Sequence, residues 1–124
     1  MPKTEVVFFR EADGRAPVQE WLSELRRRDP RAHAKCEARI RRLEALGHEL
    51  RRPEADFLRG GLYELRTRSG HVNYRILYFF HGRNAAVLVH ALTKEGAFPE
   101  ADVDRARQRM LRFGTNPRQH LKED

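Results

Sequence analysis

Hydrophobic and polar positions recur along this chain with two different periods, and the changes of period predict its elements. Residues 4–10 (TEVVFFR) are rich in Val and Phe, which favours a strand. From Pro17 onward the apolar residues Val18, Leu22 and Leu25 recur at the spacing of one helical face. Proline is favoured at the first helical position, so the helix is expected to begin at Pro17.

A second helix is predicted directly after the first. Asp29 and Pro30 separate the two, because aspartate caps a helix and proline opens one. Cys36 and Ile40 continue the helical spacing, and Gly47 is a plausible stop. Its other face carries a run of basic residues, a pattern that is most often only a solvated surface.

The remaining pattern predicts strands and one last helix. Residues 48–59 are expected to form a polar connection. Alternation with period two then predicts three consecutive strands over residues 60–94, with a hairpin at Ser69-Gly70. A helix with an apolar face follows over residues 98–113.

These elements give the order β-α-α-β-β-β-α and predict an α+β fold. We expect a small antiparallel sheet with the helices packed on one face, leaving the other at least partly open. Residues 1–113 are predicted to form a single domain. Residues 114–124 are expected to be a polar, mobile tail.

Charge suggests the kind of partner. The net charge is +7, and 21 of the 25 basic residues are arginine. The arginine side chain pairs with phosphate oxygens in bidentate geometry, which favours a nucleic-acid partner. The alternative is a genome whose codons drift toward arginine and whose helices are solvated by it. Net charge alone leaves both interpretations open.

The charge of the predicted strands is more one-sided. Residues 57–94 contain a single acidic residue, Glu64, and three histidines. Arginine and histidine together on a sheet suggest a surface that binds phosphate and transfers protons. The basic residues of this segment are Arg59, Arg66, Arg68, Arg75, Arg83 and Lys94.

Strand parity places several of these residues on one face. Arg66, Arg75, His90 and Lys94 are expected to share a surface, unless a bulge flips the alternation. RNA cleavage without a metal needs a base for the ribose 2′-OH, cations for the phosphate transition state and an acid for the leaving oxygen. These four residues and His71, which flanks the arginine hairpin, are the candidate catalytic residues.

Each candidate also has a purely structural interpretation. Either arginine could be an ion-pair partner, Lys94 could end a strand, and His90 lies between apolar neighbours and could be buried with hydrogen-bond partners. His71 lies in a turn, where exposure is the default. Further residues are candidates for binding the RNA backbone: Arg59, Arg68, Arg83, Arg39 and Arg42.

Other chemistries lack their residues. The chain has no P-loop and no G-x-S-x-G elbow, and its histidines do not show zinc-site spacing. We therefore expect no metal and no small-molecule cofactor. The single cysteine, Cys36, is predicted to be a buried core residue. No stretch resembles a signal peptide or a membrane span, so we expect a cytoplasmic protein with no membrane partner.

Four segments carry a family resemblance: LYELR (62–66), NYRILYFF (73–80), VLVHALTK (87–94) and FPEADVDRARQRM (98–110). Together they resemble the RelE/ParE superfamily of type II toxins, and most closely its HigB-like, phage-associated branch. The resemblance implies a RelE-like α+β fold and metal-independent cleavage of mRNA in the ribosomal A site. It also implies a helix-turn-helix, HigA-like antitoxin encoded beside the toxin.

The resemblance assigns the arginine of the Y-R motif to Arg75, that of the preceding strand to Arg66, and the basic residue ending the third strand to Lys94. RelE proper has two lysines where this chain has Leu62 and Glu64, and a tyrosine after its last strand that this chain lacks. The lysine-based acid–base scheme therefore does not transfer.

Three functional hypotheses follow. The first is a ribosome-dependent mRNA endonuclease in which His71 or His90 replaces the missing lysines. The second is a ParE-like toxin that binds DNA gyrase without catalysis. The third is a degenerate module that binds only RNA or its antitoxin.

Overall fold

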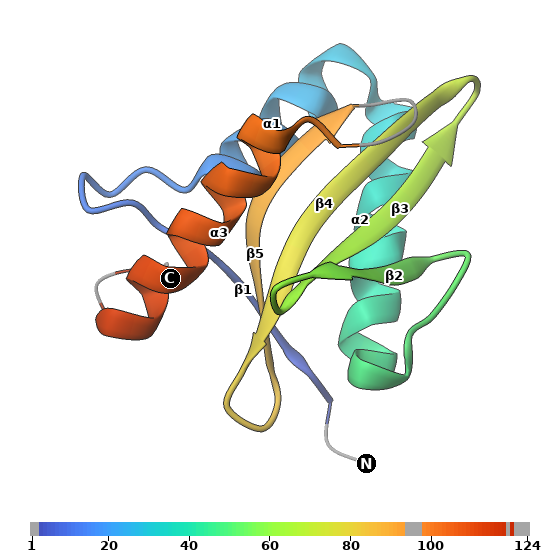
Figure 1. Ribbon diagram of the computed structural model, residues 1–124. Coiled ribbons are helices and arrows are strands. Elements are labelled where there is room, and N and C mark those ends of the chain that lie inside the picture. Colours follow the sequence, from blue (N-terminus) through green and yellow to red (C-terminus); the bar gives the residue numbers. More distant parts are fainter. Residues whose placement is uncertain (1–2, 94–97, 119, 121–124) are drawn as a thin grey trace.

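The computed structural model describes residues 3–93, 98–118 and 120. Its five strands form one mixed sheet with the order β1-β5-β4-β3-β2, and three α-helices pack against it, which confirms the α+β class (Figure 1). The strands are β1 (Glu5–Phe8), β2 (Ala55–Arg59), β3 (Leu62–Ser69), β4 (Val72–His81) and β5 (Ala85–Thr93). The helices are α1 (Pro17–Arg28), α2 (Pro30–Leu46), the short 3₁₀ helix η1 (Gly47–Glu49) and α3 (Glu100–Thr115).

The predicted start of α1 and the predicted boundaries of α2 are confirmed, and each has a local cause. Pro17 is the first residue of α1. The Asp29 carboxylate accepts a hydrogen bond from the Ala32 backbone N–H at 3.1 Å, which caps α2. Gly47 ends α2 with φ +54°, and a Cβ there would lie 2.2 Å from Thr4 Oγ1. Only glycine fits this stop without displacing the chain that leads into β1.

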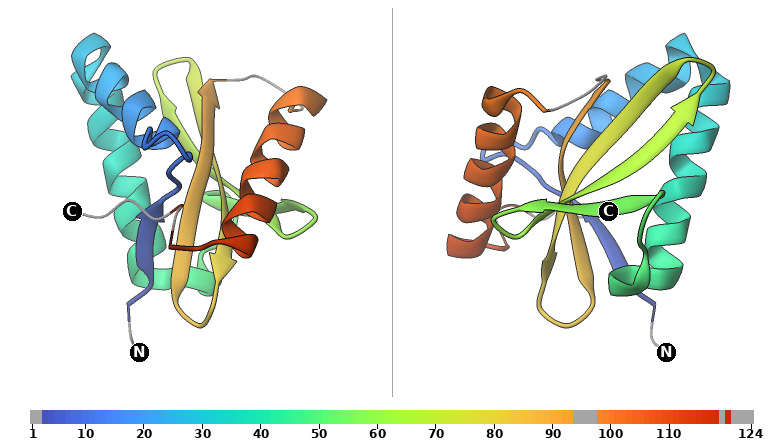
Figure 2. Two further views of the ribbon diagram at one scale, coloured as in Figure 1. Left: turned by 90° about the vertical axis from the view of Figure 1, so that its left-hand side faces the viewer. Right: turned by 45° about the vertical axis from the view of Figure 1, so that its right-hand side comes forward.

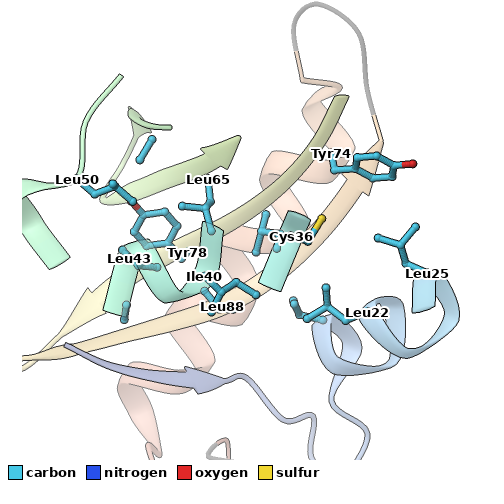
Figure 3. Close-up of a cluster of buried hydrophobic side chains, with 14 of the residues drawn as sticks. Leu22, Leu25, Cys36, Ile40, Leu43, Leu50, Leu65, Tyr74, Tyr78 and Leu88 are labelled. Atoms are coloured by element: carbon cyan, nitrogen blue, oxygen red, sulfur yellow. The ribbon is translucent and has the colours of Figure 1, made fainter. Parts of the chain in front are cut away.

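The first hydrophobic core lies between the sheet and the pair of helices α1 and α2 (Figure 3). It contains Leu22 and Leu25 of α1, Cys36 and Leu43 of α2, and Leu65 of the sheet. Tyr78 of β4, at the centre of this core, is 1% exposed. Cys36 is fully buried, as the sequence analysis expected.

A second core corrects the expected layers. Helix α3 packs on the opposite face of the sheet from α1 and α2 (Figure 2). There Val103, Ala106 and Phe113 of α3 meet Leu77 and Phe79 of β4. The expectation of helices on one face was wrong because the middle of β4 is apolar at consecutive positions, and a strand of that kind is covered on both sides.

The sheet also differs in two details from the expected antiparallel one. Strand β1 pairs in parallel with β5, so the sheet is mixed. Residues 55–59, expected to be part of a polar connection, form β2 and pair with β3. This strand is short and lies at the edge, and its central Phe57 is 55% exposed, so it shows no clear apolar alternation.

The described residues after 113 differ from the expected mobile tail. Helix α3 continues through Gly114 to Thr115. His120 is buried, stacks on the Phe9 ring with centroids 4.9 Å apart, and donates from Nδ1 to the Arg10 carbonyl oxygen at 2.7 Å. This residue is therefore part of the packed domain.

Two leucine-sized or larger side chains of α3 test its packing. Phe113 is 1% exposed, so Phe113→Ala should lower the free energy of unfolding by about 3–5 kcal/mol. Leu111 on the same helix is 57% exposed, and Leu111→Ala should change it by less than about 0.5 kcal/mol. Urea denaturation measures both, and equal losses would contradict the second core.

Candidate functional site

Two arginines stand directly opposite each other across β3 and β4. Arg66 pairs with Arg75 in the register of the hairpin. Side chains at directly opposed positions lie about 5 Å apart at Cβ, and like charges there repel. Their neighbours Leu65 and Ile76 point into the first core, so both arginines project from the face that α3 covers.

Neighbouring groups hold this pair in place. Arg66 Nε donates to the buried Glu64 carboxylate at 2.5 Å, and its Nη2 lies 3.7 Å from Asp56 Oδ2. The Arg75 guanidinium carbon lies 5.0 Å from the centre of the Phe98 ring, a cation–π distance. Both side chains remain partly exposed, so the pair is fixed in orientation and reachable from solvent.

A groove opens beside the pair at the end of the sheet. Strand β2 begins at Ala55 opposite Leu65, so β3 continues toward its hairpin without β2 beside it. The hollow here, which we call the arginine groove, has a volume of about 410 Å³. Half of its lining residues are arginines. The arginines are Arg39, Arg66, Arg68 and Arg75, and the other lining residues are Pro53, Thr67, Asn73 and Tyr74.

A second hollow of about 640 Å³ adjoins the groove and extends it onto α2, where Lys35 and Arg42 join the lining. Glu54 lies in its wall and is held by Arg39 Nη1 at 2.6 Å and Arg42 Nε at 2.8 Å. Hydrogen bonds from Arg42 and then Arg39 lower the pKa of Glu54 to about 2. The carboxylate therefore stays charged and fixes the direction of both guanidinium groups.

The structure thus brings together five of the ten candidate residues and separates others. Arg59 Nη2 forms an ion pair with both carboxylate oxygens of Glu100 at 2.7 Å, away from the groove lining. Arg83 lies in the turn between β4 and β5, at the opposite end of β4 from the arginine hairpin. His71 is exposed in the hairpin turn. Lys94 lies outside the described residues. The five residues at the joined hollows are Arg39, Arg42, Arg66, Arg68 and Arg75.

His90 shares the face of Arg75, as expected, but its side chain is buried against α3. Arg109 Nη1 lies 3.2 Å from His90 Nδ1, and because arginine can only donate, Nδ1 accepts. Nε2 therefore carries the hydrogen and donates to Asp102 Oδ1 at 2.7 Å. Burial lowers the pKa of His90, which keeps the ring neutral. Both ring nitrogens are engaged, so this histidine joins β5 to α3.

The sequence analysis did not single out Glu54, Phe98, Asp102 or Arg109 as parts of the site. Only tertiary contacts identify them, since none belongs to the alternating pattern of the strands.

Burial raises the pKa of the Cys36 thiol to about 11, which leaves it unreactive. Across residues 3–93, 98–118 and 120, no three His, Cys, Asp or Glu side chains gather as a metal site. Within the same residues, no helix has both the length and the apolar character to cross a membrane.

Residues 21–111, from α1 to near the end of α3, match the family described as phage-derived protein Gp49-like (DUF891). The chain belongs to the Gp49-like family. This is a RelE-like toxin family of toxin–antitoxin systems, so membership implies an antitoxin as partner. The matched segment of this Gp49-like protein includes every residue that lines the arginine groove. No curated protein matches the chain.

The buried histidine predicts how stability depends on pH. The lowered pKa of His90 means that the unfolded chain binds a proton that the folded chain excludes. The contribution of neutral His90 to the free energy of unfolding is complete above the ordinary histidine pKa of about 6.5. This contribution declines as the pH falls below that value. The free energy of unfolding should therefore decrease between about pH 7 and pH 5.

Urea denaturation of three proteins checks this pH dependence. His90→Gln should cost about 1–3 kcal/mol at neutral pH and flatten the decline, because Asp102 and Arg109 lose a partner. His71→Gln is the matched control, since His71 is an exposed histidine in the turn between β3 and β4. A decline that stays as steep in His90→Gln would contradict the assignment.

Proposed function

We propose that this Gp49-like protein is the toxin of a type II toxin–antitoxin system and cleaves mRNA on the ribosome without a metal ion. The arginine groove is the observation that carries the proposal. It places four guanidinium groups around one solvent-accessible hollow, with two of them directly opposed. Such an arrangement suits a phosphate group that gains negative charge during a reaction.

The groove suggests a division of roles. Arg66 and Arg75 hold the scissile phosphate and stabilise its transition state. Arg68, Arg39 and Arg42 bind the neighbouring phosphates along the path onto α2. In the reaction a base takes the proton of the ribose 2′-OH, the 2′-oxygen attacks phosphorus, and the bond to the 5′-oxygen breaks as an acid protonates that oxygen.

Two residues are proposed for these proton transfers. His71 is exposed in the turn of the hairpin that carries Arg66 and Arg75, and histidine transfers protons near neutral pH. Lys94 follows β5 in the sequence and is the second candidate. His90 is omitted, because its two nitrogens are already engaged by Asp102 and Arg109. The proposed partners are the ribosome with its mRNA and a helix-turn-helix, HigA-like antitoxin.

One observation favours a second candidate function, a toxin that binds DNA gyrase without catalysis. The two positions at which RelE proper carries lysines offer no basic side chain. Leu62 is buried in the second core, and Glu64 is buried and accepts a hydrogen bond from Arg66. In that case the groove would bind a target without cutting RNA.

Mapping of mRNA 5′ ends within minutes of induction tests the proposed cleavage. The wild type should produce new ends inside translated frames and in codon register. Arg75→Ala should reduce their number by about 100-fold or more, because a transition-state contact is lost. Arg83→Ala is the matched control, since Arg83 is an exposed arginine at the other end of β4, and it should cleave like the wild type.

Each other outcome has a clear meaning. Growth arrest without new ends would reject cleavage and direct the search to gyrase. Undiminished cleavage by Arg75→Ala at equal expression would remove Arg75 from the site. Harmless expression of the wild type would support a degenerate module.

Salt dependence tests the proposed path of the RNA backbone. Arg68→Ala should weaken ribosome binding and reduce the slope of log affinity against log salt by about one, because one phosphate contact is lost. Arg59→Ala should leave the slope unchanged, since Arg59 is ion-paired with Glu100 away from the groove lining. Binding titrations at several salt concentrations measure both, and equal slopes for the two variants would contradict the path.

A further inference from the structure

A third hollow lies at the edge of the sheet, between β2 and the segment that follows α2. Strand β2 is the outermost strand and crosses the open side of the domain (Figure 2, right). The hollow has a volume of about 430 Å³, within the size range of ligand pockets. We call it the aromatic cleft. Its lining includes the apolar and aromatic side chains of Leu50, Phe57 and Tyr63 and the charged side chains of Arg51, Arg52 and Asp56.

The aromatic residues of the cleft are supported from behind. The rings of Phe57 and Tyr63 meet edge to face with centroids 5.2 Å apart, and Tyr63 meets Phe80 at the same distance. His48 stacks on Phe80 at 3.6 Å. Phe57 is nevertheless 55% exposed. A large exposed ring on a rigid aromatic base has the character of an anchor for a partner protein.

The aromatic cleft and the arginine pair lie on opposite faces of the sheet. Tyr63 packs against the core that α1 and α2 cover, and Phe57 is its register partner on β2. Arg66 projects from the other face, with Asp56 of β2 beside it. An occupant of the aromatic cleft therefore leaves the Arg66–Arg75 pair uncovered.

Charge indicates the chemistry of the occupant. Arg52 is paired with Asp56 at 2.9 Å, whereas the exposed Arg51 side chain forms no ion pair or hydrogen bond with any described residue. RNA binding depends on several cations along a backbone, and a mainly apolar cleft with one uncommitted arginine does not provide them. An acidic peptide with an apolar side chain complements both the aromatic lining and the uncommitted charge of Arg51.

We propose that the aromatic cleft binds an acidic segment of the antitoxin, with one large apolar side chain seated against Phe57 and Tyr63. The proposal rests on the antitoxin partner of the proposed function but not on RNA cleavage. The segment would hold the toxin by the edge of its sheet and at a distance from the arginine pair.

Affinity for the antitoxin of the proposed function, sought as the product of the adjacent gene, tests the proposal. Calorimetry would compare the full-length wild type with Phe57→Ala and with Arg51→Glu. Phe57→Ala should weaken binding by at least about tenfold, as expected for an aromatic anchor. Arg51→Glu should also weaken binding, and the loss should be smaller at high salt, because Arg51 acts through its charge.

Two exposed residues of α3 serve as controls. Leu111→Ala removes an apolar side chain that is 57% exposed, and Arg107→Glu reverses an exposed charge. Both should bind like the wild type. The melting temperature of each variant shows that it is folded, and Arg51→Glu keeps the test decisive if Phe57→Ala unfolds.

Three results would overturn the proposal. The first is Phe57→Ala binding within about twofold of the wild type. The second is no binding of the neighbouring protein to the wild type. The third is unchanged affinity of Phe57→Ala combined with loss of mRNA cleavage, which would assign the aromatic cleft to RNA. Absence of cleavage in the wild type would reject the nuclease and leave the binding result valid.

Discussion

The apolar character of β4 on both faces is the constraint on which the rest of this structure depends. Tyr78 points into the core beneath α1 and α2, and Phe79 points into the core beneath α3. Because neither face can be left to water, helices must cover both, and the centre of the sheet is closed to a ligand. Polar chemistry is left with the ends and the edge. The hairpin end of β3 and β4 is where the arginines gather.

At that end, the sheet holds together charges that would otherwise separate. The register fixes Arg66 opposite Arg75, and the energy of the two cores enforces that register, since a shift by one residue would turn every apolar side chain to the wrong face. The repulsion is moderated on one side by Glu64 and on the other by the Phe98 ring. A phosphate would relieve it further, which is the physical basis for expecting an anionic ligand here.

The sequence was informative where one local pattern decided the structure. Pro17, Asp29 and Gly47 marked helix boundaries, and alternation around Ser69-Gly70 predicted that Arg66 and Arg75 share a surface. It failed where the deciding contact was distant. The α3-side core was missed because the helix pattern of α3 does not say which face of the sheet it covers.

The candidate site shows the same division between local and distant information. Arg68 and Arg75 are found from their strands alone. Glu54 became visible only when α2 brought Arg39 and Arg42 to it. Histidine is a common catalytic residue type, yet both ring nitrogens of His90 are engaged by Asp102 and Arg109, so this side chain joins β5 to α3. These contacts connect distant parts of the chain, and no spacing rule contains them.

The positions of the arginine groove and the aromatic cleft bear on how such a toxin would be controlled. The arginine groove lies at the hairpin end of β3 and β4, whereas the aromatic cleft lies beside β2. An antitoxin in the aromatic cleft would not need to imitate RNA, so its sequence could change without loss of its hold on the toxin. The antitoxin would then inhibit the toxin because the size of the complex prevents the toxin from entering the ribosome. Asp56 lines the aromatic cleft, where it is paired with Arg52, and its Oδ2 also lies 3.7 Å from Arg66 Nη2. A partner that bound Arg52 would break its ion pair with Asp56, and the Asp56 carboxylate would then interact more strongly with Arg66. Binding at the edge of the sheet would in this way alter the charge of the phosphate site through a single carboxylate.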